Sequence, residues 1–136
     1  MESLRLRRER CYNTPMTTSG SSHRHHAIDY IEITVRDVGE AKQFYGAAFG
    51  WRFADYGPTY AGIQGDEHEM GGLAQGEPLG PGGPLVVLHS HDLDATLSSV
   101  RSAGGAIVKE PYAFPGGRRF HFTDPSGNEL AVWAFA

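Results

Sequence analysis

The sequence has a single cysteine, Cys11, which excludes an internal disulfide and any metal site built from several thiolates. No apolar run approaches the roughly 20 residues that a membrane-spanning helix needs, so no membrane partner is expected. The lack of disulfides favours a reduced, cytoplasmic setting. The chain has 136 residues, of which 40% are hydrophobic. That length suits one compact domain and is too short for two independent cores.

Several catalytic motifs are also missing. No glycine-rich GxGxxG loop joins a predicted strand to a helix, which argues against nucleotide binding. The sequence has no Gly-x-Ser-x-Gly elbow and no Cys/His dyad, so nucleophilic hydrolysis is unsupported. The glycine pairs Gly71-Gly72, Gly82-Gly83 and Gly116-Gly117 are interpreted as turn and bulge elements.

The charges are unevenly distributed along the chain. Residues 1–26 hold five arginines and two glutamates, which gives them a charge of +3. Because the net charge of the whole chain is −4, the other 110 residues carry a charge of −7. An acidic body repels phosphate backbones, and no nucleic-acid partner is expected. Residues 1–26, which are also rich in Ser and His, are predicted to be a disordered tail, with Met16 as an alternative start.

The first half of the body, residues 27–76, reads as one βαβββ module. Ile28–Val35 alternates apolar and polar residues, as a half-buried strand does. Asp37 and Glu40 form a capping box at the start of a helix, and Gly50 ends it. Three short strands are then predicted, and these cover residues 51–56, 59–64 and 70–75.

The same plan returns after a Gly/Pro-rich linker at residues 77–84. In residues 85–136 a strand (85–90) precedes a helix that Asp92 caps and Gly104-Gly105 closes. Three further strands are predicted, at residues 106–108, 118–123 and 130–134. Neither module can bury its sheet face alone. The predicted fold is therefore α+β, with two paired βαβββ modules forming a curved mixed sheet around a central cavity.

These residues resemble a known family. The repeat, with VRDVGEAKQFYGAAFGW in the first half and HDLDATLSSVRSAGG and FTDPSGNELAVW in the second, is similar to the vicinal oxygen chelate superfamily. That superfamily includes glyoxalase I, extradiol dioxygenases and bleomycin-resistance proteins. The resemblance covers nearly all of residues 27–136 and points to a glyoxalase-like subgroup of unassigned activity. It implies a small-molecule ligand and a homodimer.

The resemblance also implies where a divalent metal would be held. The ligand positions on the first strand of each half fall on Tyr30 and Leu85, and a carboxylate position near the C-terminus falls on Ala131. The remaining position lies near Gly72 or Leu73. Leucine and alanine offer no donor atom, and tyrosine is a rare ligand for Zn²⁺ or Ni²⁺. No metal cofactor is therefore expected.

Strand alternation predicts which side chains line the concave face instead. Three of them are candidates for catalysis: Glu32 or His121 as the group that moves a proton, and Arg119 as the group that stabilises an oxyanion. A structural ion pair between Glu32 and Arg119 is the alternative. His89 and His121 together are either a base or a replacement metal site, or ordinary core histidines. The remaining pocket residues are expected to be Tyr30, Thr34, Tyr60, Leu85, Val87, His89, Glu129, Ala131 and Trp133.

Two functions remain open at this stage. The first is a lyase or isomerase that acts on a small carbonyl compound without the usual metal. The second is a non-catalytic protein of the bleomycin-resistance type that sequesters an aromatic or cationic compound, with Trp133, Tyr30 and Tyr60 in contact with it. Glu67, His68 and Glu69 are interpreted as a solvated, charged loop.

Overall fold

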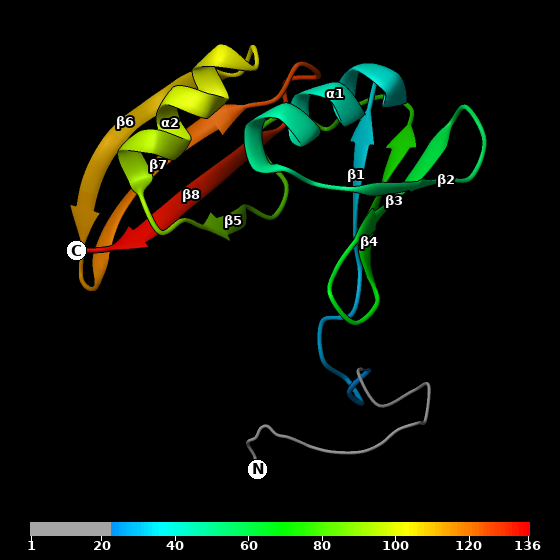
Figure 1. Cartoon of the computed structure of the whole chain (residues 1–136), viewed down its shortest axis with the longest axis horizontal. Coiled ribbons are helices and arrows are strands. Elements are labelled where there is room, and N and C mark those ends of the chain that lie inside the picture. Colours follow the sequence, from blue (N-terminus) through cyan, green and yellow to red (C-terminus); the bar gives the residue numbers. More distant parts are fainter. Residues whose placement is uncertain (1–22) are drawn as a thin grey trace.

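A computed structural model describes residues 23–136, which form two successive β-α-β-β-β modules (Figure 1). The first module consists of β1 (Ile31–Val35), α1 (Val38–Phe49), β2 (Phe53–Asp55), β3 (Tyr60–Gln64) and β4 (Glu69–Gln75). The second consists of β5 (Val86–His89), α2 (Leu93–Ser102), β6 (Ala106–Phe114), β7 (Gly117–Thr123) and β8 (Glu129–Phe135). This order confirms the predicted repeat.

Both helices begin where the sequence predicts. The Asp37 side chain accepts a hydrogen bond from the Glu40 backbone N–H, and Asp92 does the same for Ala95, which satisfies amide groups that the helix leaves free. Gly50 ends α1 with a φ of 74°, a left-handed conformation that glycine adopts without strain. Neither helix is long and apolar enough to cross a membrane within the described part of the chain.

Each module has its own four-stranded mixed sheet. The strand orders are β1-β4-β3-β2 and β5-β8-β7-β6, and the first strand of each sheet runs parallel to the last strand of its module. Within residues 23–136 no strand pairing joins the two sheets. The helices pack against each other on the same side of the molecule, and the sheets diverge below them (Figure 1).

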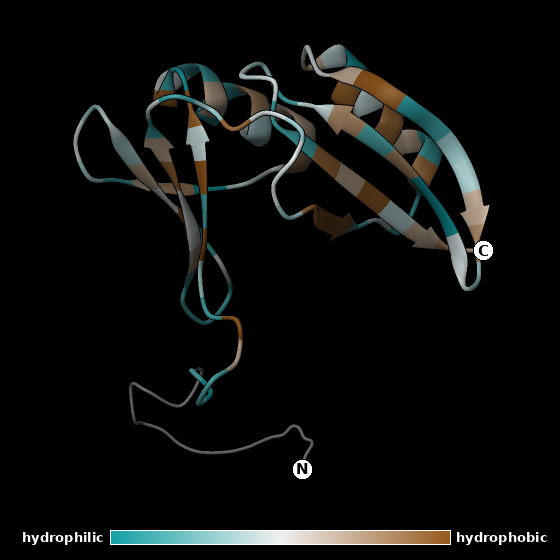
Figure 2. Cartoon of the chain, turned by 180° about the vertical axis from the view of Figure 1, so that it is seen from behind, coloured by the Kyte–Doolittle hydropathy of each residue, from teal (hydrophilic) through white to brown (hydrophobic). Residues whose placement is uncertain are grey.

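The hydrophobic core lies between the helices and the sheet faces beneath them. Phe44 and Tyr45 of α1 and Phe120 and Phe122 of β7 are almost fully buried there. Along the strands, apolar residues that face the helices alternate with residues that face the other way. The mixed colouring of β7 and β8 in Figure 2 shows this alternation. The faces turned away from the helices remain open for a binding site.

The turn between β7 and β8 joins the two modules. The Asp124 side chain accepts hydrogen bonds from the backbone N–H groups of Ser126 and Asn128 and from the hydroxyl of Tyr45 in α1. Asn128 in turn donates to the Thr34 carbonyl, and Arg36 donates to the Ser126 carbonyl. The first module is thereby held against the end of the second sheet.

The strand boundaries differ from the predicted ones at a few positions. β6 extends to Phe114 instead of ending at Val108, and Glu69 opens β4 instead of lying in a loop. Gly71 and Gly72 lie inside β4, so they are not turn residues, but the register of β3 and β4 shifts next to Gly71, between Ile63 and Gln64. Residues 1–22 of the predicted tail lie outside the described residues. The last residues of that tail form a turn, in which the Ala27 N–H donates to the Arg24 carbonyl.

Candidate functional site

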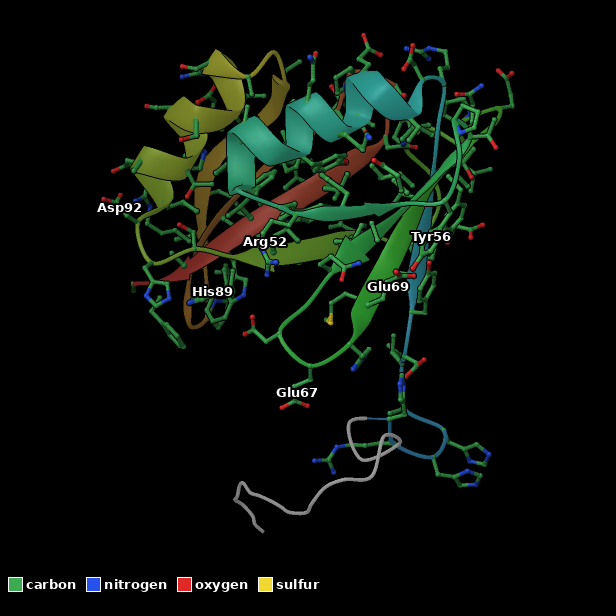
Figure 3. The ribbon with its side chains drawn as sticks, turned by 45° about the vertical axis from the view of Figure 1, so that its right-hand side comes forward. Arg52, Tyr56, Glu67, Glu69, His89 and Asp92 are labelled. Atoms are coloured by element: carbon green, nitrogen blue, oxygen red, sulfur yellow. The ribbon has the colours of Figure 1, made fainter. Side chains whose placement is uncertain are left out.

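The open face of the first sheet carries a tyrosine–glutamate cluster, defined by Tyr30, Glu32, Tyr56, Tyr60 and Glu69. The Tyr60 hydroxyl donates to Glu32 Oε1 at 2.9 Å and is also hydrogen-bonded to the Tyr30 hydroxyl. Glu69 accepts from the Tyr56 hydroxyl at 2.7 Å, and its Oε2 lies 3.2 Å from the Tyr30 hydroxyl, whose single proton is shared between Tyr60 and Glu69. Figure 3 shows Tyr56 and Glu69 turned toward each other. The phenols of Tyr60 and Tyr30 thus connect the two carboxylates, and the phenol of Tyr56 binds Glu69 alone.

Two paired glycines form the floor of this cluster. Gly62 of β3 lies opposite Gly72 of β4. A Cβ at Gly72 would lie 2.1 Å from the Tyr60 hydroxyl oxygen, and one at Gly62 would lie 2.1 Å from a carboxylate oxygen of Glu69. These distances are far below van der Waals contact, so the cluster in this form requires glycine at both positions.

The phenols of the cluster are hydrogen-bond donors over a wide pH range. Burial raises the pKa of Tyr60, and its hydrogen bonds to Tyr30 and Glu32 raise it further. The hydrogen bond to Glu69 raises the pKa of Tyr56, and the negative charge of Glu69 adds to that effect. In both cases a phenolate would lose a favourable contact with a carboxylate. Tyr56 and Tyr60 therefore stay protonated and donate hydrogen bonds to Glu69 and Glu32.

The open face of the second sheet carries a histidine relay, defined by Tyr112 of β6, Arg119 and His121 of β7 and Glu129 of β8. His121 Nδ1 lies 2.8 Å from Glu129 Oε2, and His121 Nε2 lies 2.8 Å from the Tyr112 hydroxyl. Arg119 Nε donates to the same hydroxyl at 2.5 Å. His121 is only 4% exposed, whereas Tyr112 and Arg119 are half-buried. The buried imidazole is thus connected to a more accessible phenol.

The hydrogen-bond network assigns the protons of the relay. A carboxylate can only accept, so the Nδ1 atom of His121 carries the ring proton that faces Glu129. Nε2 is then an acceptor, and the Tyr112 hydroxyl donates to it. The Tyr112 oxygen accepts in turn from the Arg119 guanidinium. This arrangement is that of a base, His121, oriented by a carboxylate and directed at a phenol.

Arg119 also borders a small hollow on the second sheet, together with Val87, Phe114 and Trp133. The guanidinium carbon lies 5.9 Å from the centre of the Phe114 ring. The His89 ring lies 4.7 Å from that of Trp133, at the exposed end of β5. His89 is labelled in Figure 3. A cation among aromatic rings suits a planar ligand with an electron-rich oxygen. We call this place the arginine hollow.

A second cavity, of about 150 Å³, lies at the junction of the modules. Glu32 and Thr34 of β1 and Glu129 of β8 provide carboxylate and hydroxyl groups in its wall. Most of the remaining wall is apolar or glycine: Ile31, Ile33, Leu79, Gly80, Gly83, Pro84, Val86 and Leu130. One carboxylate of each polar cluster therefore borders the same junction cavity.

The structure thus places the three predicted catalytic residues in two groups. His121 and Arg119 share the relay through Tyr112, whereas Glu32 belongs to the tyrosine–glutamate cluster. The alternative of an ion pair between Glu32 and Arg119 is wrong within residues 23–136, since each has the different partner given above.

The other predicted pocket residues are distributed over both open faces. Tyr30 and Tyr60 join the tyrosine–glutamate cluster, Thr34 and Glu129 border the junction cavity, and Val87 and Trp133 border the arginine hollow. His89 is exposed beside Trp133, Leu85 lies just before β5 and is 38% exposed, and Ala131 is fully buried in β8.

The donor set does not fit the metal of the related family. Of the positions that the resemblance implies, Leu85 and Ala131 carry no donor atom, and the Tyr30 hydroxyl is bonded to Tyr60 and Glu69. Within the described chain, one group of three His, Cys, Asp or Glu residues has ligand atoms close enough to share an ion, and it does not include His89 or His121. We derive no reaction step through a metal on the open faces.

Sequence reasoning missed Tyr112, Tyr56 and Glu69 as members of the clusters. Tyr112 follows Pro111, where the predicted strand had already ended, although an edge strand such as β6 tolerates proline. Tyr112 pairs with Arg119, and alternation alone could not have predicted this, because the register of β6 and β7 shifts twice between Ile107 and Tyr112. Tyr56 lies just after β2, outside the predicted alternation of the strand face.

Comparison with known proteins gives one family. The model for the Glyoxalase/Bleomycin resistance protein/Dioxygenase superfamily matches residues 27–132. An anthracycline biosynthesis protein of Streptomyces peucetius, DnrV, is 30% identical over 113 residues, which cover 78% of this chain. The match covers 40% of that relative, so the chain spans well under half of its length.

Solved structures give the same fold. A glyoxalase-related enzyme from Fulvimarina pelagi superposes with a TM-score of 0.70 at 18% identity, over 81% of this chain and 88% of the other. A glyoxalase/bleomycin resistance protein/dioxygenase family enzyme from Burkholderia phytofirmans gives a TM-score of 0.70 at 17% identity, over 80% and 98%. At such identities the likeness concerns the fold, and a fold hosts many reactions.

Proposed function

Because the chain belongs to the Glyoxalase/Bleomycin resistance protein/Dioxygenase superfamily, we propose that it is a lyase or isomerase that acts on a small carbonyl compound. The observation that carries this proposal is the histidine relay. It connects a buried, oriented base through the Tyr112 phenol to the Arg119 guanidinium, which borders the arginine hollow. Among the groups that sequence analysis singled out, His121 and Arg119 therefore act together, and Glu32 acts elsewhere.

The relay supports proton abstraction next to a carbonyl group. The C–H bond of the substrate breaks as its proton passes to the Tyr112 oxygen, while the Tyr112 hydroxyl proton passes to His121 Nε2. Glu129 stabilises the imidazolium that forms. The negative charge moves onto the substrate oxygen, where the terminal nitrogens of Arg119 stabilise it. Return of the proton to another carbon gives an isomerase, and loss of a β-substituent gives a lyase.

Proton exchange tests this proposal before the substrate is known. The full chain is incubated in D₂O with a panel of small α-hydroxy ketones and α-keto aldehydes, and exchange next to the carbonyl is followed by NMR. We expect Tyr112→Phe and His121→Asn to slow exchange by about 10²–10⁴-fold, the usual contribution of a general acid or base. Tyr56→Phe, a tyrosine of the other cluster, is the matched control and should exchange like the wild type. Equal rates in wild type and Tyr112→Phe would refute the relay as the catalytic centre.

A specific observation supports a second candidate, sequestration of a cationic compound. Glu32 and Glu69 lie among three aromatic rings, and within residues 23–136 neither forms an ion pair with a lysine or arginine. Two uncompensated carboxylates beside tyrosine faces attract an organic cation. A relative named for anthracycline biosynthesis is compatible with small-molecule handling of either kind.

Substitutions of Glu32 and Trp133 separate the two candidates. Glu32→Gln keeps the shape and the bond from Tyr60 but removes a negative charge. For a sequestering protein we expect weaker binding of a quaternary ammonium probe in calorimetry, and weaker binding of a planar aromatic probe for Trp133→Ala. If Glu32→Gln abolishes proton exchange while Tyr112→Phe does not, Glu32 is the base. If both variants bind and exchange like the wild type, the open faces are not the functional site.

We make three further proposals, on the compartment of the protein, its partners and its dependence on a metal. We place it in the cytoplasm, since a single cysteine gives no disulfide to protect. The negative charge of residues 27–136 disfavours nucleic acid as a partner. We also propose that it acts without a metal on the open faces, because the positions that hold one in the related family lack donors.

A further inference from the structure

Three side chains from two turns meet at the far end of the first sheet, away from the histidine relay. They are His23, Asp29 and His68, and one potential ligand atom from each lies within 4.8 Å of the other two. His23 Nδ1 lies 2.5 Å from Asp29 Oδ1, and the rings of His23 and His68 have centroids 4.4 Å apart. His23 and Asp29 are exposed and His68 is half-buried.

A tight turn brings His23 back to Asp29. The Ala27 N–H donates to the Arg24 carbonyl at 3.1 Å, which closes the turn. His26 has a φ of 66°, a left-handed conformation that few residues other than glycine adopt. The chain reverses there, so two residues that are six positions apart come into direct contact.

A second tight turn positions His68. The Gly65 N–H donates to the His68 carbonyl at 3.0 Å and closes the loop between β3 and β4. A Cβ at Gly65 would lie 2.7 Å from that carbonyl oxygen, so the loop in this form requires glycine there. This loop, where Figure 3 labels Glu67, lies next to the segment that precedes β1 in Figures 1 and 3. Asp66 and Glu67 add negative charge to it.

We infer that His23, Asp29 and His68 bind a divalent first-row transition metal ion, of which zinc is the representative. Two imidazole nitrogens and one carboxylate oxygen form a donor set that zinc accepts, with water at the remaining position. Ligands about 2.0–2.2 Å from a tetrahedral ion lie roughly 3.5 Å from one another. Small side-chain rotations that widen the 2.5 Å contact between His23 and Asp29 bring the three ligand atoms to this spacing. The bound ion would fasten the segment before β1 to the β3–β4 loop.

Calorimetric titration of the metal-free full chain with zinc chloride tests this site. We expect one zinc ion per wild-type chain and an affinity at least about 10-fold lower in His68→Ala and in Asp29→Asn, since even outer-shell changes cost that much. His91→Ala removes an exposed histidine elsewhere and should bind like the wild type. In thermal unfolding, zinc should raise the Tm of the wild type and of His91→Ala, but not that of His68→Ala.

Two further variants exclude other sources of zinc binding. The double variant His25→Ala/His26→Ala removes the adjacent histidines, and we expect it to keep the ion. Loss of binding in that variant, together with unchanged binding in His68→Ala, would show simple chelation by the histidine tract and overturn the proposal. Loss of the ion in His121→Asn would also overturn it, because the ion would then lie on the second sheet. Absence of any zinc binding by the wild type has the same consequence.

Discussion

Gly71 and Gly72 are adjacent in β4, yet their hydrogen atoms face different neighbours. A Cβ at Gly71 would lie 2.1 Å from the backbone oxygen of Ile31, its partner in β1. A Cβ at Gly72 would meet the tips of two tyrosine side chains instead, at 2.1 and 2.7 Å. The first glycine permits strand pairing and the second permits the tyrosine–glutamate cluster. A single sequence shows only a glycine pair, because the groups that occupy the space come from other strands.

Alanine substitutions should therefore have graded effects on the free energy of unfolding. Gly71→Ala must displace backbone and should cost about 3 kcal/mol or more, the upper end for overpacking. Gly72→Ala displaces phenol tips and should cost about 1–2 kcal/mol, while also breaking the bond from Tyr60 to Glu32. Gly46→Ala in α1 is the control, because its Cβ would have ordinary contacts only. It should stabilise the protein by about 0.5–1 kcal/mol.

Urea denaturation measures all three changes. The order Gly71→Ala, then Gly72→Ala, then Gly46→Ala is the prediction, from least to most stable. A Gly72→Ala variant as destabilised as Gly71→Ala would mean that the tyrosines cannot move aside. A Gly72→Ala variant as stable as the wild type would mean that the cluster contributes nothing to stability.

At the scale of elements, the helix-capping residues and the alternation of apolar and polar residues along the strands were sufficient to predict most of the fold. Asp37, Gly50 and Asp92 mark the helix ends, and the apolar face of each strand follows from period 2. The end of β6 was not predictable in this way, because Pro111 resembles a strand breaker until its strand is known to lie at a sheet edge. The histidine relay was incomplete in the sequence for that reason: its phenol, Tyr112, lies beyond the proline.

The contact between α1 and the β7–β8 turn gives a second prediction. Tyr45 is fully buried and donates to Asp124, which is itself 4% exposed. Tyr45→Phe removes this donor and should lower the free energy of unfolding at pH 7 by about 1–3 kcal/mol. Tyr56→Phe, at a residue that is 60% exposed, should change it far less. Equal losses in the two variants would contradict the role of this contact.

The pH dependence of stability tests the same contact. Burial raises the pKa of Tyr45 above its ordinary value, and the negative charge of Asp124 adds to this effect. Above about pH 10 the unfolded chain releases the Tyr45 proton and the folded chain does not, so stability falls as pH rises. Tyr45→Phe should remove about 1.4 kcal/mol per pH unit from that decline. A decline of unchanged slope in the variant would show that Tyr45 ionises normally in the fold.

At the scale of the whole molecule, the two modules leave their polar clusters on separate sheets. Strand alternation predicted that these residues converge on one concave face, whereas the structure divides them between the open faces of two sheets. The sequence could not predict that Arg119 donates to Tyr112 and lies apart from Glu32, because the angle between the sheets decides which side chains meet.

A homodimer, which the family resemblance implies, remains a prediction at this scale. Leu85 and Val87 lie at the open edge of the second sheet and are 38% and 40% exposed, and Phe135 at the end of β8 is 72% exposed. Apolar groups gathered at an uncovered sheet edge are typical of an interface. In a twofold dimer the same patch of each copy would be covered. We therefore expect light scattering to give twice the 14.8 kDa mass of one chain.

Substitution of Val87 tests whether this edge forms the interface. Val87→Lys places a charge in the patch and should shift the mass toward that of the single chain at low protein concentration, because burial of an unpaired ammonium is costly. Ser98→Lys on the exposed side of α2 adds the same charge elsewhere and should leave the dimer intact. A wild-type protein that keeps the mass of one chain at every concentration would contradict the dimer. A dimer unaffected by Val87→Lys would place the interface on another surface.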